Sequence, residues 1–237
     1  MKVIDILNKS DKAVFSFELV PPLKGGDINK IYEAIEPLIA LAPPFINITF
    51  HRDEVVYREY PDGTIKKVTV TKRPGSVALA AAIMKRYNVD MVPHIVCGGA
   101  TRHKIENELI DLNFLDIENV MALRGDPIPG ERFFTPEEGG HQYSCELVEQ
   151  ITRMNHGQYL DDTLTEAVPT NFCIGVAGYP EKHYEAPNQA CDIENLKKKV
   201  DAGANYIVTQ MFSITPNFSS LSINAERKEL TYLSYRD

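Results

Sequence analysis

Two acidic residues in this sequence follow apolar runs of the kind that form buried strands. Asp126 lies in Arg124-Gly125-Asp126-Pro127, directly after the run 117–123, and Glu18 follows the run 13–17. In parallel α/β proteins the carboxyl end of a strand is where ligands bind and where chemistry is done. A carboxyl group there can hold or transfer a proton, or stabilise a cation, but it can equally cap a helix or pair with a base. The residues alone leave both roles open.

Uncharged and basic candidates stand at comparable positions. His94 lies inside the apolar run 90–97, where a hydrogen-bonded core histidine is a commoner outcome than a catalyst. Thr49 and Gln210 end apolar runs and suit either a ligand contact or a contact to loop backbone. A predicted helix carries three further polar residues at i, i+3 and i+4: Asn195, Lys198 and Lys199. Such a cluster binds phosphate in some proteins and is only solvated in most.

These candidates belong to a chain in which strand and helix patterns alternate. Strands without polar alternation are expected at 13–17, 45–50, 90–97, 117–123, 172–177 and 206–211. Helices are expected between them, at 28–38, 77–87, 102–112, 143–154 and 193–202. Repeated βα units predict a parallel sheet covered by helices, and no Gly-x-Gly-x-x-Gly turn follows the first strand. We therefore predict an α/β fold of the TIM-type (β/α)8 class, with about six of the eight βα units in this chain.

Two segments do not follow the βα rhythm. Residues 51–73 contain two strand patterns around Pro61-Asp62-Gly63, which predicts a hairpin inserted after the second strand. Residues 213–237 show neither a convincing strand nor an amphipathic helix. We predict a partial barrel domain over 1–212 and an aberrant or irregular tail over 213–237.

The composition is that of an ordinary globular protein of 237 residues, with 43% hydrophobic residues and a formal net charge of -8. The acidic excess argues against a general binder of nucleic acid or anionic membranes. No apolar stretch is long enough for a signal peptide or a membrane span, so we expect a cytoplasmic protein. The four cysteines are widely spaced, which favours structural thiols, and no His/Asp/Glu cluster predicts a metal site.

Taken together, the strand ends resemble the methylenetetrahydrofolate reductase family, flavin enzymes built on a (β/α)8 barrel. The matching segments occur in the family's order: Phe15-Ser-Phe-Glu-Leu-Val-Pro-Pro22, Pro93-His94, Ala122-Leu-Arg-Gly-Asp126, Ala177-Gly-Tyr-Pro-Glu-Lys-His183, Asn195-Leu-Lys-Lys-Lys-Val-Asp-Ala-Gly-Ala-Asn205 and Thr209-Gln210. Their number and order make the resemblance specific, and it extends over 14–212.

The resemblance implies FAD-dependent reduction of 5,10-methylenetetrahydrofolate to 5-methyltetrahydrofolate, with NADH or, as the less favoured donor, NADPH. It implies that Glu18 is the general acid that protonates the folate, that Asp126 tunes the flavin electrostatically, and that Gln210 contacts the folate. We also expect a homo-oligomer, and no nucleic-acid or membrane partner. The positions that match FAD contacts are Thr49, His94, Arg124, Gly125, Asp126, Tyr143, Ser144, Tyr179, His183, Asp192, Asn195, Lys198 and Lys199.

Two parts of the chain depart from the family pattern. His51-Arg52-Asp53-Glu54 stands where the family has a Gly-rich turn, which weakens the expected cofactor contact at Thr49. After Phe212 the family continues with Phe-Asp or similar, whereas this chain continues Ser213-Ile214-Thr215. If these three residues are encoded TCG-ATA-ACN, one additional T before them gives TTC-GAT-AAC, which reads Phe-Asp-Asn. We therefore hypothesise a one-base deletion, with a naturally divergent tail as the alternative.

A chain without the last two strands would have an open barrel, so we expect impaired activity and self-association. Two alternatives of other classes remain. One is a barrel lyase or aldolase that uses Glu18 and a lysine, and the other is a catalytically inactive barrel remnant that only binds ligands.

Overall fold

The structure is a computed structural model that describes residues 1–212. Residues 213–237 lie outside the described residues, and with them the predicted irregular tail and the frame change after Phe212. The described chain forms a parallel sheet, an antiparallel hairpin and helices that pack mainly on one face of the sheet.

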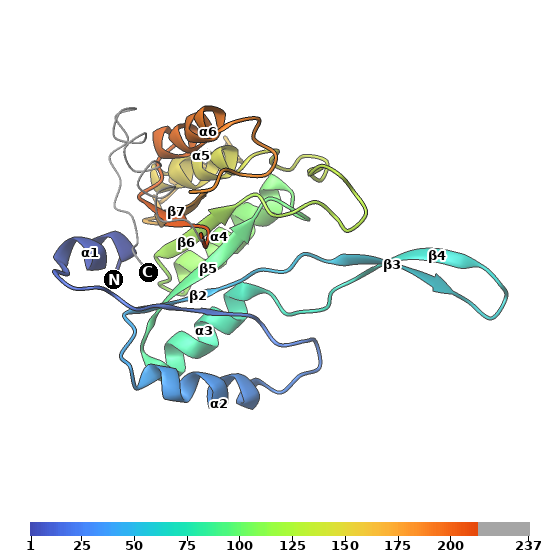
Figure 1. Cartoon of the computed structure of the whole chain (residues 1–237), viewed down its shortest axis with the longest axis horizontal. Helices are drawn as coiled ribbons and strands as arrows, with labels where there is room; N and C mark the ends of the chain where they lie inside the picture. Colours follow the sequence, from blue (N-terminus) through green and yellow to red (C-terminus); the bar gives the residue numbers. More distant parts are fainter. Residues whose placement is uncertain (213–237) are drawn as a thin grey trace.

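All strands of the main sheet run in one direction, in the order β1-β2-β5-β6-β7-β8. The strands are β1 Phe17–Leu19, β2 Phe45–Ile48, β5 Asp90–Val96, β6 Asn119–Leu123, β7 Cys173–Gly178 and β8 Tyr206–Thr209. The sheet curls into a half-barrel (Figure 1), which confirms the predicted parallel sheet and its barrel class. Within residues 1–212 the sheet ends at β1 on one side and β8 on the other.

Five helices cover the outer face of the curl: α2 Ile28–Ile39, α3 Ser76–Tyr87, α4 Arg102–Phe114, α5 Ser144–Asn155 and α6 Gln189–Asp201. Because successive strand residues point to opposite faces, every second residue faces these helices. The outer core joins Ile46, Ile95, Val120 and Ile174 of the strands to Ile83, Leu109, Ile151 and Leu196 of the helices. Side-chain caps fix three helix starts: Asp27 accepts a hydrogen bond from the Asn29 amide, Thr101 from the Lys104 amide and Asn188 from the Cys191 amide.

The inner face of the curl carries a second apolar layer, formed by Phe45, Val92, Met121, Cys173 and Tyr206. The short helix α1, Val3–Lys9, covers the amino end of this layer through Val3. Asn119 holds the helix in place, because its Oδ1 accepts a hydrogen bond from the Val3 amide at 2.8 Å and its Nδ2 donates to the Met1 carbonyl at 3.0 Å. Helix α1 covers the amino end, and the opposite, carboxyl edge of the strands is where ligands bind in folds of this class.

The insertion after β2 is a hairpin of β3, Glu54–Glu59, and β4, Ile65–Val70. It projects away from the body of the molecule (Figure 1). The turn between the strands has Gly63 at a φ of 76° and Asp62 accepting a hydrogen bond from the Thr64 amide. The predicted hairpin is therefore confirmed, and its base lies at the carboxyl edge.

Several boundaries differ from the sequence expectations, among them the end of β2 at Ile48 and the start of β6 at Asn119. The first strand begins at Phe17, not at residue 13, and β8 ends at Thr209. Helix α6 begins at Gln189, four residues before Ile193, because its cap is Asn188. Helix α1 was not predicted. Among the described helices, none combines the length and the apolar character that crossing a bilayer requires.

Candidate active site

Parallel strands bring their carboxyl ends to one edge of the sheet, so the loops after β1, β2, β5, β6, β7 and β8 lie on the same side. The predicted site residues in these loops fall into two groups. One group surrounds Glu18 and His94, and the other surrounds Arg124, Tyr179 and Lys199.

Glu18 and His94 approach each other across the inner face. The distance from His94 Nε2 to Glu18 Oε2 is 3.7 Å, which is too long for a hydrogen bond. Burial, with a smaller effect of His51, lowers the pKa of His94 to about 4, so its imidazole is neutral at pH 7. The Glu18 side chain is 59% exposed, yet partial burial raises the pKa of its carboxyl group. The pair is therefore a neutral imidazole beside a carboxyl group that holds its proton more firmly than an ordinary glutamate.

Arg124 is held in a fixed position at the end of β6. Its Nη1 donates to Glu185 Oε2 at 2.6 Å, and its guanidinium lies 5.1 Å from the centre of the Phe134 ring. The hydrogen bond from Arg124 is the main reason that the pKa of Glu185 lies below its ordinary value. Both side chains are largely buried, at 16% and 21% exposed, so screening by water is limited.

Gly125 turns the chain sharply between Arg124 and Asp126. Its φ is 86°, and a Cβ at this position would lie 2.6 Å from Val96 Cγ1. Only glycine adopts this backbone and fits this space without strain. The turn leaves the Asp126 side chain exposed, and the Asp126 carbonyl accepts a long hydrogen bond of 3.5 Å from Arg52 Nη1.

The loop after β7 and helix α6 form an aromatic and cationic corner. The rings of Tyr179 and His183 meet edge to face with centroids 4.7 Å apart, and the His183 amide donates to Asp192 Oδ2 at 3.0 Å. Lys199 Nζ donates to the Ala177 carbonyl at 2.8 Å and lies 5.8 Å from the centre of the Tyr179 ring. Burial lowers the pKa of Lys199, although the nearby Asp192 opposes the shift.

Other predicted residues take no part in the contacts described within these two groups. Lys198 is exposed, and its Nζ lies 3.3 Å from Asn195 Oδ1 on the surface of α6. A helix turns about 100° per residue, so Lys198 points well away from the stripe of Asp192 and Lys199. Thr49 is bound to β1, since its hydroxyl donates to the Leu19 carbonyl at 3.3 Å.

The remaining predicted residues flank the edge. Tyr143 is 55% exposed and immediately precedes α5, where its amide donates to Glu146 Oε2 at 3.3 Å. Ser144, the first residue of α5, is buried. Gln210 is exposed just after β8, and its amide donates to the Gly178 carbonyl at 2.8 Å.

Four residues of the site were not predicted: Glu185, Phe134, Arg52 and Asn47. Glu185 and Phe134 fix Arg124, but they lie in loops whose sequence gives no sign of that contact. Arg52 lies 3.7 Å from Glu137 and so links the loop after β2 to the loop after β6. Asn47 pairs in register with Glu18. It could have been identified from the sequence, because it is a polar residue within an apolar strand.

The second group suits a flavin dinucleotide. Two cations, Arg124 and Lys199, fit an anionic pyrophosphate, and Tyr179 with His183 offers aromatic surface. The glycine at 125 keeps the backbone free of a side chain beside the strand end. The types of side chain present are therefore compatible with the predicted cofactor.

Comparison with known proteins agrees with the predicted family and fold. A model of the family described as methylenetetrahydrofolate reductase matches residues 2–228. The chain is 32% identical over 230 residues to methylenetetrahydrofolate reductase (NADH) 1 of Arabidopsis thaliana, with coverage of 92% of this chain and 34% of that protein. It is 29% identical over 197 residues to 5,10-methylenetetrahydrofolate reductase of Salmonella typhimurium, with coverage of 83% and 54%.

The chain thus spans about a third to about half of the length of these curated relatives. Among solved structures, 2,3-dimethylmalate lyase superposes with a TM-score of 0.57 and 6% identity, covering 98% of this chain and 68% of the lyase chain. At that identity the likeness shows the fold alone. The family match continues past Phe212 to residue 228, which a change of frame at Phe212 does not by itself explain, and the deletion stays a prediction.

Proposed function

Because the chain belongs to the methylenetetrahydrofolate reductase family, we propose that it reduces 5,10-methylenetetrahydrofolate to 5-methyltetrahydrofolate, with FAD as cofactor and NADH or NADPH as donor. The name of the Arabidopsis thaliana relative supports NADH as the first donor to test. When bound, FAD would supply the chemistry of hydride acceptance and donation. The observation that carries the proposal is the carboxyl group of Glu18 beside the neutral imidazole of His94.

Glu18 is suited to act as the general acid. Ring opening of the methylene bridge requires a proton on a folate nitrogen, and an acid works best when its pKa approaches the working pH. Burial raises the pKa of Glu18, and the neutral His94 adds no positive charge that would lower it. The proton would leave the Glu18 carboxyl group and bind the folate nitrogen, which gives a cation.

Residues at the other strand ends would bind and orient the folate and the cofactor. Asp126 is exposed at the edge, where its negative charge would stabilise a cationic folate. Gln210, exposed after β8, would orient the folate by hydrogen bonds. Arg124, Tyr179 and Lys199 would hold the cofactor, and Tyr143, Ser144, His183 and Asp192 would complete that contact set.

The experiment compares the wild-type chain with Glu18→Gln after reconstitution with FAD. The wild type should show NADH-dependent bleaching of flavin absorbance and methylenetetrahydrofolate-dependent oxidation of NADH. Glu18→Gln should keep the bleaching and lose about 10²–10⁴-fold in the folate reaction, the usual contribution of a general acid. Glu33→Gln, an exposed carboxylate on α2, is the matched control and should behave as wild type.

The outcomes separate this proposal from its alternatives. A protein that binds no flavin and cleaves a carbon–carbon bond would be a barrel lyase or aldolase. A protein that binds flavin without any bleaching by NADH or NADPH would be an inactive binding protein. Equal folate reduction by Glu18→Gln and wild type would remove Glu18 from the mechanism.

We also infer that the chain forms a homo-oligomer. In the described residues β1 and β8 are edge strands of the main sheet, and edge strands favour pairing with other chains. Light scattering on the eluting peak of a size-exclusion column measures the mass, and a monomer at all concentrations would contradict this inference.

A further inference from the structure

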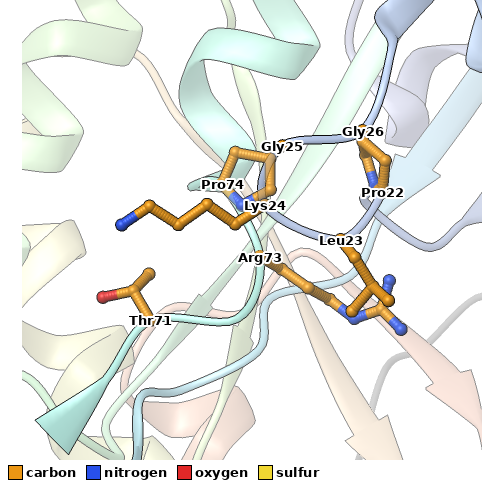
Figure 2. Close-up of a pocket in the computed structure, with 8 residues that line it drawn as sticks. All are labelled: Pro22, Leu23, Lys24, Gly25, Gly26, Thr71, Arg73 and Pro74. Carbon is orange, nitrogen blue, oxygen red and sulfur yellow. The ribbon is translucent and has the colours of Figure 1, made fainter.

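A cavity of about 280 Å³ lies between the loop from β1 to α2 and the loop from β4 to α3 (Figure 2). Pro22, Leu23 and Pro74 supply apolar wall, and Lys24, Thr71 and Arg73 supply polar groups. Neither lysine nor arginine here belongs to the residues that the proposed reduction uses.

The cavity is joined to the proposed acid by a short stretch of chain. Its first lining residue, Pro22, is four positions after Glu18 in the same chain segment, so their Cα atoms are at most about 14 Å apart. The β4–α3 loop returns to the same edge from the inserted hairpin. Two contacts hold the loops together: the Lys24 amide donates to the Lys72 carbonyl at 2.7 Å, and Arg73 Nη1 donates to the Pro21 carbonyl.

The cavity is cationic in a protein whose net charge is -8. Its lining includes Lys24 and Arg73 and contains no acidic residue. Within residues 1–212 the Lys24 ammonium has no hydrogen-bond or ion-pair partner, while the guanidinium of Arg73 uses one of its donors on Pro21. Figure 2 shows the Lys24 ammonium extended toward Thr71 and the Arg73 guanidinium on the opposite side, beside Leu23.

Two separated cations and apolar walls fit one kind of ligand. Proline and leucine faces pack against a flat ring, and ammonium and guanidinium groups bind carboxylates. The acidic tail of a folate has this structure, since a p-aminobenzoyl ring carries one or more glutamates. The pterin end of the same molecule must reach Glu18 for protonation, which the short separation from Pro22 permits.

We propose that this cavity binds the p-aminobenzoylglutamate tail of the folate substrate, with the ring against Pro22 and Pro74 and the carboxylates at Lys24 and Arg73. The subsite rests on the proposed function for the identity of its ligand. Its residues come from the β1–α2 loop and from the base of the inserted hairpin, so the insertion would contribute directly to substrate binding.

The test measures binding of p-aminobenzoyl-triglutamate to the full chain by isothermal titration calorimetry. Lys24→Gln should weaken binding about 1.4- to 5-fold, the range of one exposed charge pair, and Lys24→Glu should weaken it further. Lys12→Gln is the matched control, because Lys12 is an exposed lysine before β1, on the amino side of the sheet, and its variant should bind as wild type does. Raising the salt concentration should reduce the difference between wild type and Lys24→Gln.

Failure of the subsite and failure of the proposed reduction give different results. If the wild type does not bind the probe, or if Lys24→Gln and Lys24→Glu bind it as well as wild type, the subsite is wrong, whatever the reductase assay shows. If binding depends on Lys24 but the chain reduces no folate, the subsite holds and the proposed reduction fails. If Lys24→Gln instead raises only the KM for NADH or NADPH, the cavity binds the phosphates of the dinucleotide and the folate-tail assignment is overturned.

Discussion

Replacing Gly125 with alanine tests whether the turn before Asp126 is set by steric contact as well as by backbone conformation. A residue with a Cβ at a φ of 86° costs about 1–2 kcal/mol. The new Cβ would also lie 2.6 Å from Val96 Cγ1, and such overpacking costs about 1–3 kcal/mol. Gly125→Ala should therefore lower the free energy of unfolding by about 2–5 kcal/mol in total.

Gly130 gives a matched control in the same loop. Its φ is 96°, but nothing lies within 4 Å of the position that a Cβ would take. Gly130→Ala should show the conformational cost alone, about 1–2 kcal/mol. The difference between the two alanine variants is then a first measure of the steric cost.

A double-mutant cycle gives a second measure of the same quantity. Val96→Ala removes the methyl group that the new Cβ would meet, so the pair Gly125→Ala and Val96→Ala should be less destabilised than the sum of the single variants by about 1–3 kcal/mol. Urea denaturation followed by circular dichroism measures all four proteins. A coupling energy within about 0.5 kcal/mol of zero would refute the steric account, as would equal losses for Gly125→Ala and Gly130→Ala.

The titrating groups of the site give two further predictions. Because the folded state lowers the pKa of His94 to about 4, the unfolded chain takes up a proton there first, and stability should fall by about 3 kcal/mol as the pH drops from 6.5 to 4. His94→Gln should flatten that part of the pH–stability curve, and parallel curves for variant and wild type would contradict the assignment. The ion pair of Glu185 with Arg124 stabilises the fold above the ordinary glutamate pKa and is lost as the pH falls through the lower pKa of the folded state. Glu185→Gln should cost about 1–3 kcal/mol at pH 7 and almost nothing at pH 2, and a loss that does not vary with pH would exclude the ion pair as its cause.

The arrangement of strands and helices was predictable because its signals are local. Apolar runs without alternation gave the parallel strands, and Pro61-Asp62-Gly63 gave the hairpin turn. Helix α1 was missed because it has only seven residues and is held by Asn119, which is 116 positions away from Val3. The start of β1 was missed for a related reason: its limits follow from pairing with β2, not from its own composition.

The sequence predicted that the site lies at the carboxyl edge of the sheet, but it did not predict which side chains contact each other there. Strand ends marked Glu18 and Asp126, yet the approach of His94 to Glu18 depends on the sheet order β1-β2-β5, in which the hairpin insertion is skipped. The partner of Arg124 could not be found from sequence, because Glu185 lies 61 positions away in a loop. The sequence was sufficient to predict that Lys199 and Lys198 point in different directions, because successive residues of a helix are about 100° apart.

The burial of His94 connects the fold to the proposed proton transfer. An imidazolium 3.7 Å from Glu18 would favour the carboxylate and lower its pKa, which would weaken the glutamate as an acid. The environment of His94 on the inner face, where it pairs in register with Met121, removes that charge at neutral pH. The proposed acid therefore depends on a histidine that is not protonated at neutral pH. Any change that lets water reach His94 should weaken Glu18 as a proton donor, even though Glu18 itself is unchanged.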